Sequence, residues 1–115
     1  SYGRGAYLAE SCLQADEYTS NEDGAYPLIL SRVLLGKVYI CRDPPQEPDK
    51  LERGFQRGEY DSVLGDREQL EETYREYIVY DSAQVFPEFL VWYHKRFYGY
   101  MAGTVGEDEF RALEY

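Results

Sequence analysis

Basic residues are scarce in this chain. Its 115 residues include 12 Lys and Arg against 22 Asp and Glu, which gives a formal net charge of −10. Proteins that bind a nucleic-acid backbone need clustered lysines and arginines to displace its counterions. We therefore expect no direct nucleic-acid binding by this segment. A nucleotide ligand stays possible, because a small pocket can be locally neutral or basic in an acidic protein.

Cysteine is also rare, since only Cys12 and Cys41 occur, far apart and without CxxC spacing. Two thiols are too few for a disulfide-dense secreted scaffold. We expect both to be reduced in an intracellular protein, nuclear or cytoplasmic, and we expect no metal cofactor.

Long apolar runs are missing. No stretch approaches the roughly 20 apolar residues that a membrane-spanning helix requires, and the first residues show no basic-then-apolar leader. We therefore expect no membrane partner. The only methionine is Met101, and the chain begins with a loop-like run, residues 1–5. These features lead us to expect a fragment of a longer protein whose N-terminal part is missing.

The composition fits one small domain. Hydrophobic residues make up 43% of the chain, which is enough for one modest core. We expect this domain to span residues 1–98, followed by an acidic tail, residues 99–115, that can form one weak helix.

Turn-forming residues divide the first part of the chain into short segments. We expect a strand over residues 6–9 and a short helix within residues 10–19, with Ser11 available as its N-cap. Residues 28–41 are rich in aliphatic and β-branched side chains. This composition predicts one long strand, bent near Gly36, that forms the core of the sheet.

The second part begins with a segment of different composition. Three prolines and three glycines in residues 42–70 predict an extended surface loop, within which residues 60–66 look the most ordered. Aromatic and β-branched residues then predict two strands, residues 74–81 and 86–97. The sequence therefore predicts a strand-dominated α+β domain.

Glu76 is the most informative residue, because a carboxylate inside an apolar, aromatic strand is costly unless it is paired or used. The period of two places Glu76, Ile78 and Tyr80 on one face of this strand and Tyr77 and Val79 on the other. Two interpretations stay open. Glu76 lies at the start of the strand, where it reaches water or pairs with a neighbouring arginine, or it takes part in chemistry.

Four blocks of sequence support the second interpretation. Residues 3–9 read Gly-Arg-Gly-Ala-Tyr-Leu-Ala, and residues 30–39, 60–63 and 76–90 follow in order. Together they resemble the catalytic domain of the poly(ADP-ribose) polymerase family: its Gly-x-Gly-x-Tyr-Phe-Ala signature, its central strand, its acceptor-side segment and its closing strands. The resemblance covers the C-terminal two-thirds of that domain. It implies an ADP-ribosyltransferase-like fold of split antiparallel sheets with a short helix.

The resemblance also implies a function. Members of the family bind NAD and transfer ADP-ribose to acceptor proteins, themselves included, with release of nicotinamide. Tyr7 and Tyr18 would sandwich the nicotinamide ring, and Glu76 would accept a hydrogen bond from the ribose hydroxyl and stabilise the positive charge that grows on the ribose. Gly5 belongs to the same NAD-binding signature. Polymer formation is compatible with Glu76.

Two departures from the family pattern bear on this function. The family's catalytic histidine has no counterpart, since the only histidine is His94, which we expect to be structural or exposed. Ala15 stands where most relatives place a serine that bonds the nicotinamide amide, and Ser11 can shift to compensate. A catalytically inactive module that binds NAD, ADP-ribose or another protein is therefore the alternative. In either case the segment would hold half of the NAD pocket.

Overall fold

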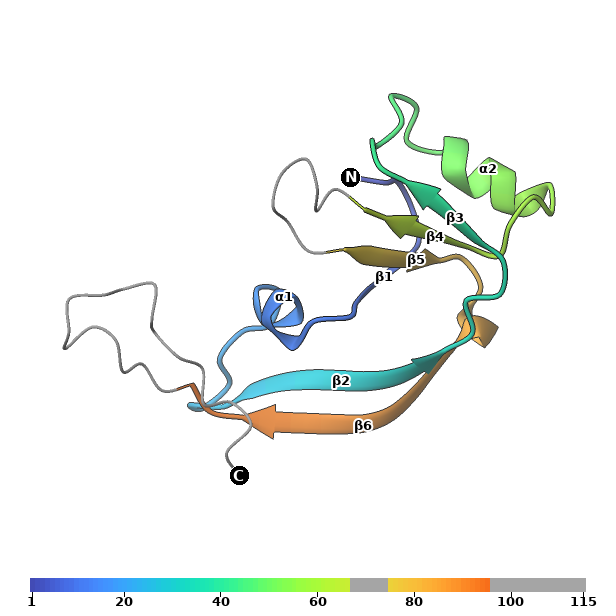
Figure 1. Ribbon diagram of the computed structural model, residues 1–115. Helices are drawn as coiled ribbons and strands as arrows, with labels where there is room; N and C mark the ends of the chain where they lie inside the picture. The colour runs from blue at the N-terminus through green and yellow to red at the C-terminus, as the bar shows by residue number, and fades with distance from the viewer. Residues whose placement is uncertain (67–74, 96–115) are drawn as a thin grey trace.

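A computed structural model describes residues 1–66 and 75–95 of the chain, and it has a strand-dominated α+β fold with two sheets (Figure 1). Its elements are, in chain order, β1 (Ala6–Ala9), α1 (Cys12–Asp16), β2 (Tyr26–Val33), β3 (Val38–Cys41), α2 (Lys50–Gln56), β4 (Ser62–Gly65), β5 (Glu76–Val79), the 3-10 turn η1 (Ser82–Gln84) and β6 (Val85–Tyr93). The predicted tail, residues 99–115, lies outside the described residues. No helix in the described part is long and apolar enough to cross a membrane.

The larger sheet has the strand order β1-β5-β4-β3, and the smaller one is a ribbon of β2 and β6. All strand pairs are antiparallel except β3 and β4, which are parallel. Two neighbouring parallel strands need a crossover connection, which the segment containing α2 supplies. The expectation of antiparallel sheets is therefore correct for every pair but this one.

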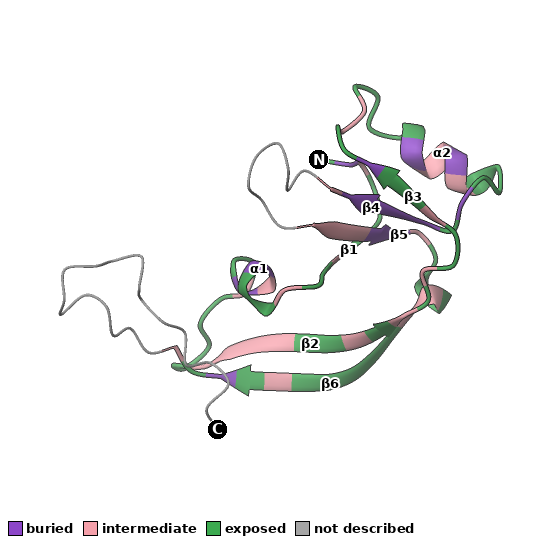
Figure 2. Cartoon of the chain, viewed as in Figure 1, coloured by how far each residue is buried: buried purple, intermediate pink, exposed green. Residues whose placement is uncertain are grey.

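Residues 42–66, the described part of the segment of residues 42–70, are not the extended surface loop that its prolines and glycines predicted. They contain α2, which packs on the larger sheet, and β4, whose four residues are all buried at the centre of that sheet (Figure 2). The helix was missed because Gly54 lies within it, and glycine is unfavourable in the interior of a helix. A Cβ there would lie 2.2 Å from the Tyr60 hydroxyl oxygen, so the glycine is required by packing. The expectation that residues 60–66 are the ordered part is confirmed.

The main core lies between α2 and one face of the larger sheet. Val63 and Ile78 are fully buried on that face, and Leu51 of α2 covers them. The Phe55 ring packs against Tyr80, with 5.0 Å between the ring centroids. Register pairing puts Ile78 beside Val63, as the period of two requires.

The prediction of one bent strand over residues 28–41 is wrong. The segment forms two strands in different sheets, separated by Gly36, whose φ is +57°. A Cβ at Gly36 would lie 2.3 Å from the Asp61 carboxylate, which accepts a hydrogen bond from the Lys37 N–H at 2.7 Å. The chain therefore leaves the ribbon here and enters the larger sheet. Nor is this segment the core, because β3 is an edge strand and no residue of β2 is buried.

The ribbon of β2 and β6 exposes apolar side chains on the described surface. Ile29, Leu30, Phe89 and Leu90 are each about 60% exposed. Pro87, which lacks a backbone N–H, is tolerated within β6 because each strand of this ribbon has only one hydrogen-bonded neighbour. The Gln84 side chain joins ribbon and sheet, because its Nε2 donates to the carbonyl oxygens of Leu34 and Asp61.

Candidate functional site

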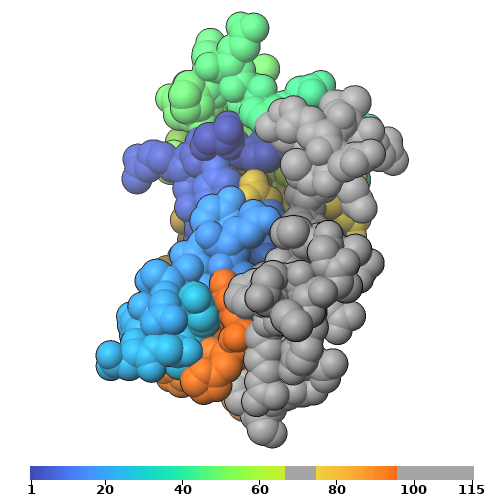
Figure 3. Space-filling model, turned by 90° about the vertical axis from the view of Figure 1, so that its left-hand side faces the viewer, coloured from blue at the N-terminus to red at the C-terminus, as the bar shows by residue number. Residues whose placement is uncertain are grey.

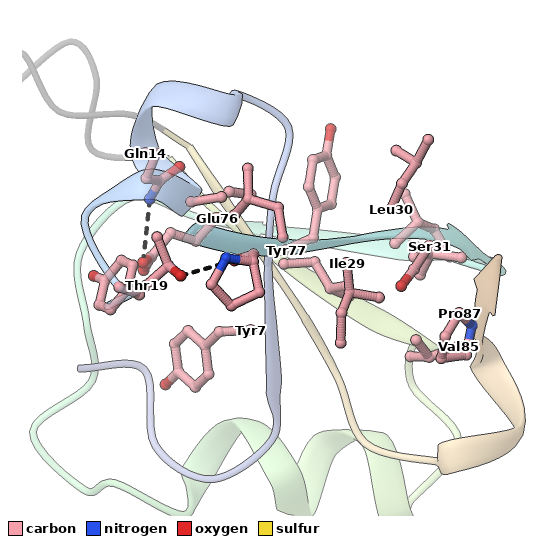
Figure 4. A pocket seen from close by; sticks show the side chains of 18 of the residues that line it. Tyr7, Gln14, Thr19, Ile29, Leu30, Ser31, Glu76, Tyr77, Val85 and Pro87 are labelled. Carbon is pink, nitrogen blue, oxygen red and sulfur yellow. Dashed lines mark hydrogen bonds between the residues drawn. The ribbon is translucent and has the colours of Figure 1, made fainter. Parts of the chain in front are cut away.

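A cleft of about 1060 Å³ opens between α1, the beginning of β5 and the ribbon (Figure 4). Its lining is mostly apolar and comes from both sheets and from the segment of residues 14–19. The volume lies at the upper end of the roughly 300–1,000 Å³ typical of ligand pockets. Four of the predicted site residues line it: Tyr7, Ala15, Tyr18 and Glu76.

Glu76 is the first residue of β5, which is the position that the first of the two interpretations gave it. In the register it lies opposite Ala9 of β1 and Gly65 of β4. The carboxylate does not pair with the preceding arginine. Arg75 instead holds Glu10 in a two-pronged ion pair, with Nε–Oε1 and Nη2–Oε2 distances of 2.7 and 3.0 Å.

The Arg75–Glu10 pair fastens the end of β1 to the beginning of β5, just outside the cleft. Hydrogen bonding to Glu10 raises the pKa of the Arg75 guanidinium above its already high value, so the pair stays ionised. Both side chains remain more than a third exposed, so solvent screens the pair and its contribution to stability is small. Its geometric effect is to fix the backbone on which Glu76 is carried.

Gln14 of α1 is the hydrogen-bond partner of Glu76. Its Nε2 donates to Glu76 Oε1 at 3.3 Å, and the Gln14 side chain is buried (Figure 4). The sequence analysis missed this residue, because the two side chains are 62 positions apart. A glutamine in a five-residue helix gives no local signal of such a contact.

The short helix α1 is anchored at both ends. Ser11 is its N-cap, as predicted, and its Oγ accepts the Leu13 N–H at 3.2 Å. At the other end the buried Asp16 accepts a hydrogen bond from the Tyr93 hydroxyl at 2.5 Å and forms an ion pair with Lys95 at 2.9 Å. These contacts hold α1 against the end of β6, as the space-filling view of this side also shows (Figure 3).

The two tyrosines of the predicted ring sandwich present aromatic surface. The Tyr7 ring is 41% exposed and Tyr18 is 77% exposed. The Tyr7 hydroxyl donates to the Gly3 carbonyl oxygen at 2.5 Å and accepts the Tyr2 N–H at 3.1 Å. These bonds fix one end of the Tyr7 ring and leave its faces available for stacking.

Gly5 and Ser11 are not among the residues that line the cleft. Gly5 has a φ of +143°, and a Cβ on it would lie 2.5 Å from the Ile78 side chain, so its place is explained by close packing. The Ser11 hydroxyl caps α1. A shift of Ser11 to compensate for Ala15 would cost that capping bond, which is worth about 1 kcal/mol.

The remaining polar groups limit the ligands that fit. No lysine or arginine of the described chain lines the cleft. His94 is exposed, as expected, and its Nδ1 lies 2.9 Å from the Gly24 carbonyl oxygen. Within residues 1–66 and 75–95 no cluster of His, Cys, Asp or Glu could hold a metal ion. Cys12 and Cys41 are both free thiols.

Comparison of the chain with protein-family models, with curated proteins and with solved structures finds no match. The geometry and chemistry of the cleft therefore carry the functional argument.

Proposed function

We propose that this chain is part of an NAD-dependent protein ADP-ribosyltransferase of the poly(ADP-ribose) polymerase family, with an ADP-ribosyltransferase-like fold. One observation carries the proposal. Tyr7, Ala15 and Tyr18 come from the N-terminal stretch of residues 7–18 and Glu76 from the distant strand β5, and all four line the same cleft.

The exposed tyrosine rings fit the nicotinamide end of NAD. Stacking of a flat aromatic ring against Tyr7 and Tyr18 is worth on the order of 1 kcal/mol for each contact beyond the buried area. The backbone bonds of the Tyr7 hydroxyl hold its ring in place before a ligand arrives. Ala15 lines the same region without offering a hydrogen bond, so recognition of the carboxamide would fall to backbone groups.

Glu76 fits the role of the ribose-orienting carboxylate. Within residues 1–66 and 75–95 it accepts one side-chain hydrogen bond, at Oε1, which leaves Oε2 for a ribose hydroxyl. When the bond between the ribose carbon and the nicotinamide nitrogen breaks, its electron pair leaves with nicotinamide and positive charge grows on the ribose. A fixed carboxylate in a partly dry cleft stabilises that charge better than water does. A nucleophile of the acceptor protein, this chain included, then forms the new bond to the ribose carbon and loses its proton.

The cleft fits NAD in part. Its apolar walls, aromatic rings and carboxylate suit nicotinamide and its ribose, whereas the absence of a cationic lining side chain in the described residues leaves the diphosphate without a countercharge. This division agrees with the expectation that the segment holds half of an NAD pocket.

The alternative function is a module that binds NAD, ADP-ribose or a protein without catalysis. Ala15 and the lack of a histidine in the cleft favour it, because both remove polar contacts that the family uses.

The two functions are separated by incubating the full chain with NAD labelled in both the nicotinamide and the adenosine. For the transferase we expect nicotinamide release and label on protein, both reduced about 10²–10³-fold in Glu76→Gln. Glu59→Gln, which changes the same charge on an exposed side chain paired with Arg57, is the matched control and should act like the wild type. If Glu76→Gln transfers as much label as the wild type, the role assigned to Glu76 is wrong. Calorimetric NAD binding without nicotinamide release would favour the binding module.

A further inference from the structure

We infer that Gln14 is a positioning residue for Glu76: its neutral amide holds one carboxylate oxygen in place while leaving the negative charge and the second oxygen to the substrate. The inference rests on the proposed function. It adds a residue that the four matching sequence blocks did not identify.

The orientation of the Gln14 amide is forced by chemistry. An ionised carboxylate can only accept hydrogen bonds, so the amide must direct its NH₂ group, and not its oxygen, toward Glu76. The 3.3 Å bond from Nε2 to Glu76 Oε1 satisfies this requirement. The amide oxygen then points the other way, into a buried place where it has no hydrogen-bond partner among the described residues.

That buried oxygen indicates that the contact with Glu76 decides how the amide is placed. An unsatisfied buried acceptor is unfavourable, and a glutamine placed only for stability would direct its oxygen to a donor or to water. Gln14 is only 6% exposed. The bonds of Asp16 to Tyr93 and Lys95 hold α1, which carries Gln14, in place.

The neutrality of the amide matters for the proposed reaction. A lysine or arginine at this position would also donate to Glu76, but it would place a positive charge beside the carboxylate and oppose the charge that grows on the ribose. An apolar side chain would leave the carboxylate free to rotate. Glutamine combines a donor that reaches Glu76 with no net charge.

Three substitutions separate these effects. Gln14→Leu removes the donor at similar size, and we expect kcat to fall about tenfold with KM changed less than about threefold, since a bond to a charged group is lost. Gln14→Lys keeps a donor and adds charge, and it should lower kcat at least as much.

Gln14→Glu gives the sharpest readout. Two carboxylates sharing one site raise the pKa of the pair, so one of them is protonated as the pH falls. The acid form then donates O–H to its neighbour as the amide does, and the kcat of this variant relative to the wild type should recover between pH about 8 and about 5. Nearby charged groups are Glu10 with Arg75, Asp66, and Asp16 with Lys95, and because the wild type contains all of them, the ratio of the two kcat values at each pH controls for them. A purely structural role for Gln14 would not produce this recovery.

A measurement on the free protein tests the contact without activity. In nitrogen-15 NMR spectra, the chemical shifts of the Gln14 side-chain amide protons should differ between the wild type and Glu76→Gln, and they should be the same in Glu59→Gln as in the wild type. Thermal unfolding of each variant shows that it is folded.

The outcomes separate the inference from the proposed function. Wild-type activity that needs Glu76 but is unchanged in Gln14→Leu, or a Gln14→Glu variant with no recovery at low pH, would overturn the role of Gln14 and leave the proposed function standing. A wild-type chain with no nicotinamide release, but with the expected difference in the Gln14 amide shifts, would overturn the transferase and keep the contact.

Discussion

Replacing Asp16 with alanine should destabilise this protein strongly, although Asp16 belongs to a helix of only five residues. The substitution removes two interactions at once, the hydrogen bond from the Tyr93 hydroxyl and the ion pair with Lys95. Lys95 also lies over the Tyr26 ring, 4.0 Å from its centroid, and Tyr26 stacks on Tyr93. Asp16 therefore joins α1 to the far end of the ribbon.

The expected magnitude follows from burial. The side chains of Asp16 and Lys95 are 11% and 15% exposed, so their ion pair is largely desolvated. Removing one partner of a buried pair costs about 3–5 kcal/mol. Lys95 keeps its contact with Tyr26, which places the expected loss at the lower end, about 3 kcal/mol. Tyr93→Phe removes only the hydrogen bond to the charged acceptor and should cost about 1.5–3 kcal/mol.

Unfolding in denaturant measures these losses of stability. It can be followed by the fluorescence of Trp92, the single tryptophan, which precedes Tyr93 in the sequence. Glu88→Ala is the matched control, because its ion pair with Arg32 is exposed and should be worth less than about 1 kcal/mol. If Asp16→Ala lowers the free energy of unfolding no more than Glu88→Ala does, the contacts of Asp16 with Tyr93 and Lys95 do not stabilise the fold. Under the proposed function, Asp16→Ala should also weaken NAD binding, since α1 carries groups of the cleft.

Two further predictions concern packing under α2. Tyr60→Phe should cost about 1–2 kcal/mol of stability, because the Tyr60 hydroxyl donates to the Leu51 carbonyl oxygen at 2.6 Å. Tyr80→Phe should be neutral or stabilising by up to about 1 kcal/mol, because the Tyr80 hydroxyl is buried without a hydrogen-bond partner among the described residues. Burial raises the pKa of Tyr80 above the unfolded value of about 10, so its contribution to stability is complete below that pH and is lost as the pH rises. Tyr80→Phe should therefore resist alkaline unfolding better than the wild type. Equal pH midpoints of unfolding for the two proteins would contradict this. Gly54→Ala should cost about 1–3 kcal/mol of stability, because the added methyl group displaces the Tyr60 hydroxyl. The control Gln56→Ala, at an exposed position of the same helix, should cost less than about 0.5 kcal/mol. Equal thermal midpoints of the two variants would refute the packing argument.

Prediction from sequence succeeded where the signal is local. The strand of residues 6–9, the cap at Ser11 and the position of Glu76 at the start of a strand all depend on a few neighbouring residues, and the structure contains each of them. Prediction from local composition failed for residues 42–66, where prolines and glycines indicated a loop but the structure contains α2 and the central strand β4. In that segment packing against distant residues outweighs the weak local preference.

The sequence by itself determined which residues are candidates for chemistry: Glu76 is visible as a carboxylate in an apolar strand, and Tyr7 and Tyr18 follow from the resemblance to a family. Only the tertiary structure decided how they are placed. It put Tyr7, Tyr18 and Glu76 around one cleft, left Gly5 and Ser11 outside its lining, and brought Gln14 to Glu76 across 62 positions of sequence. The physical reason is that a strand's period of two fixes which face a side chain takes, whereas the partner it meets there depends on the path of the whole chain.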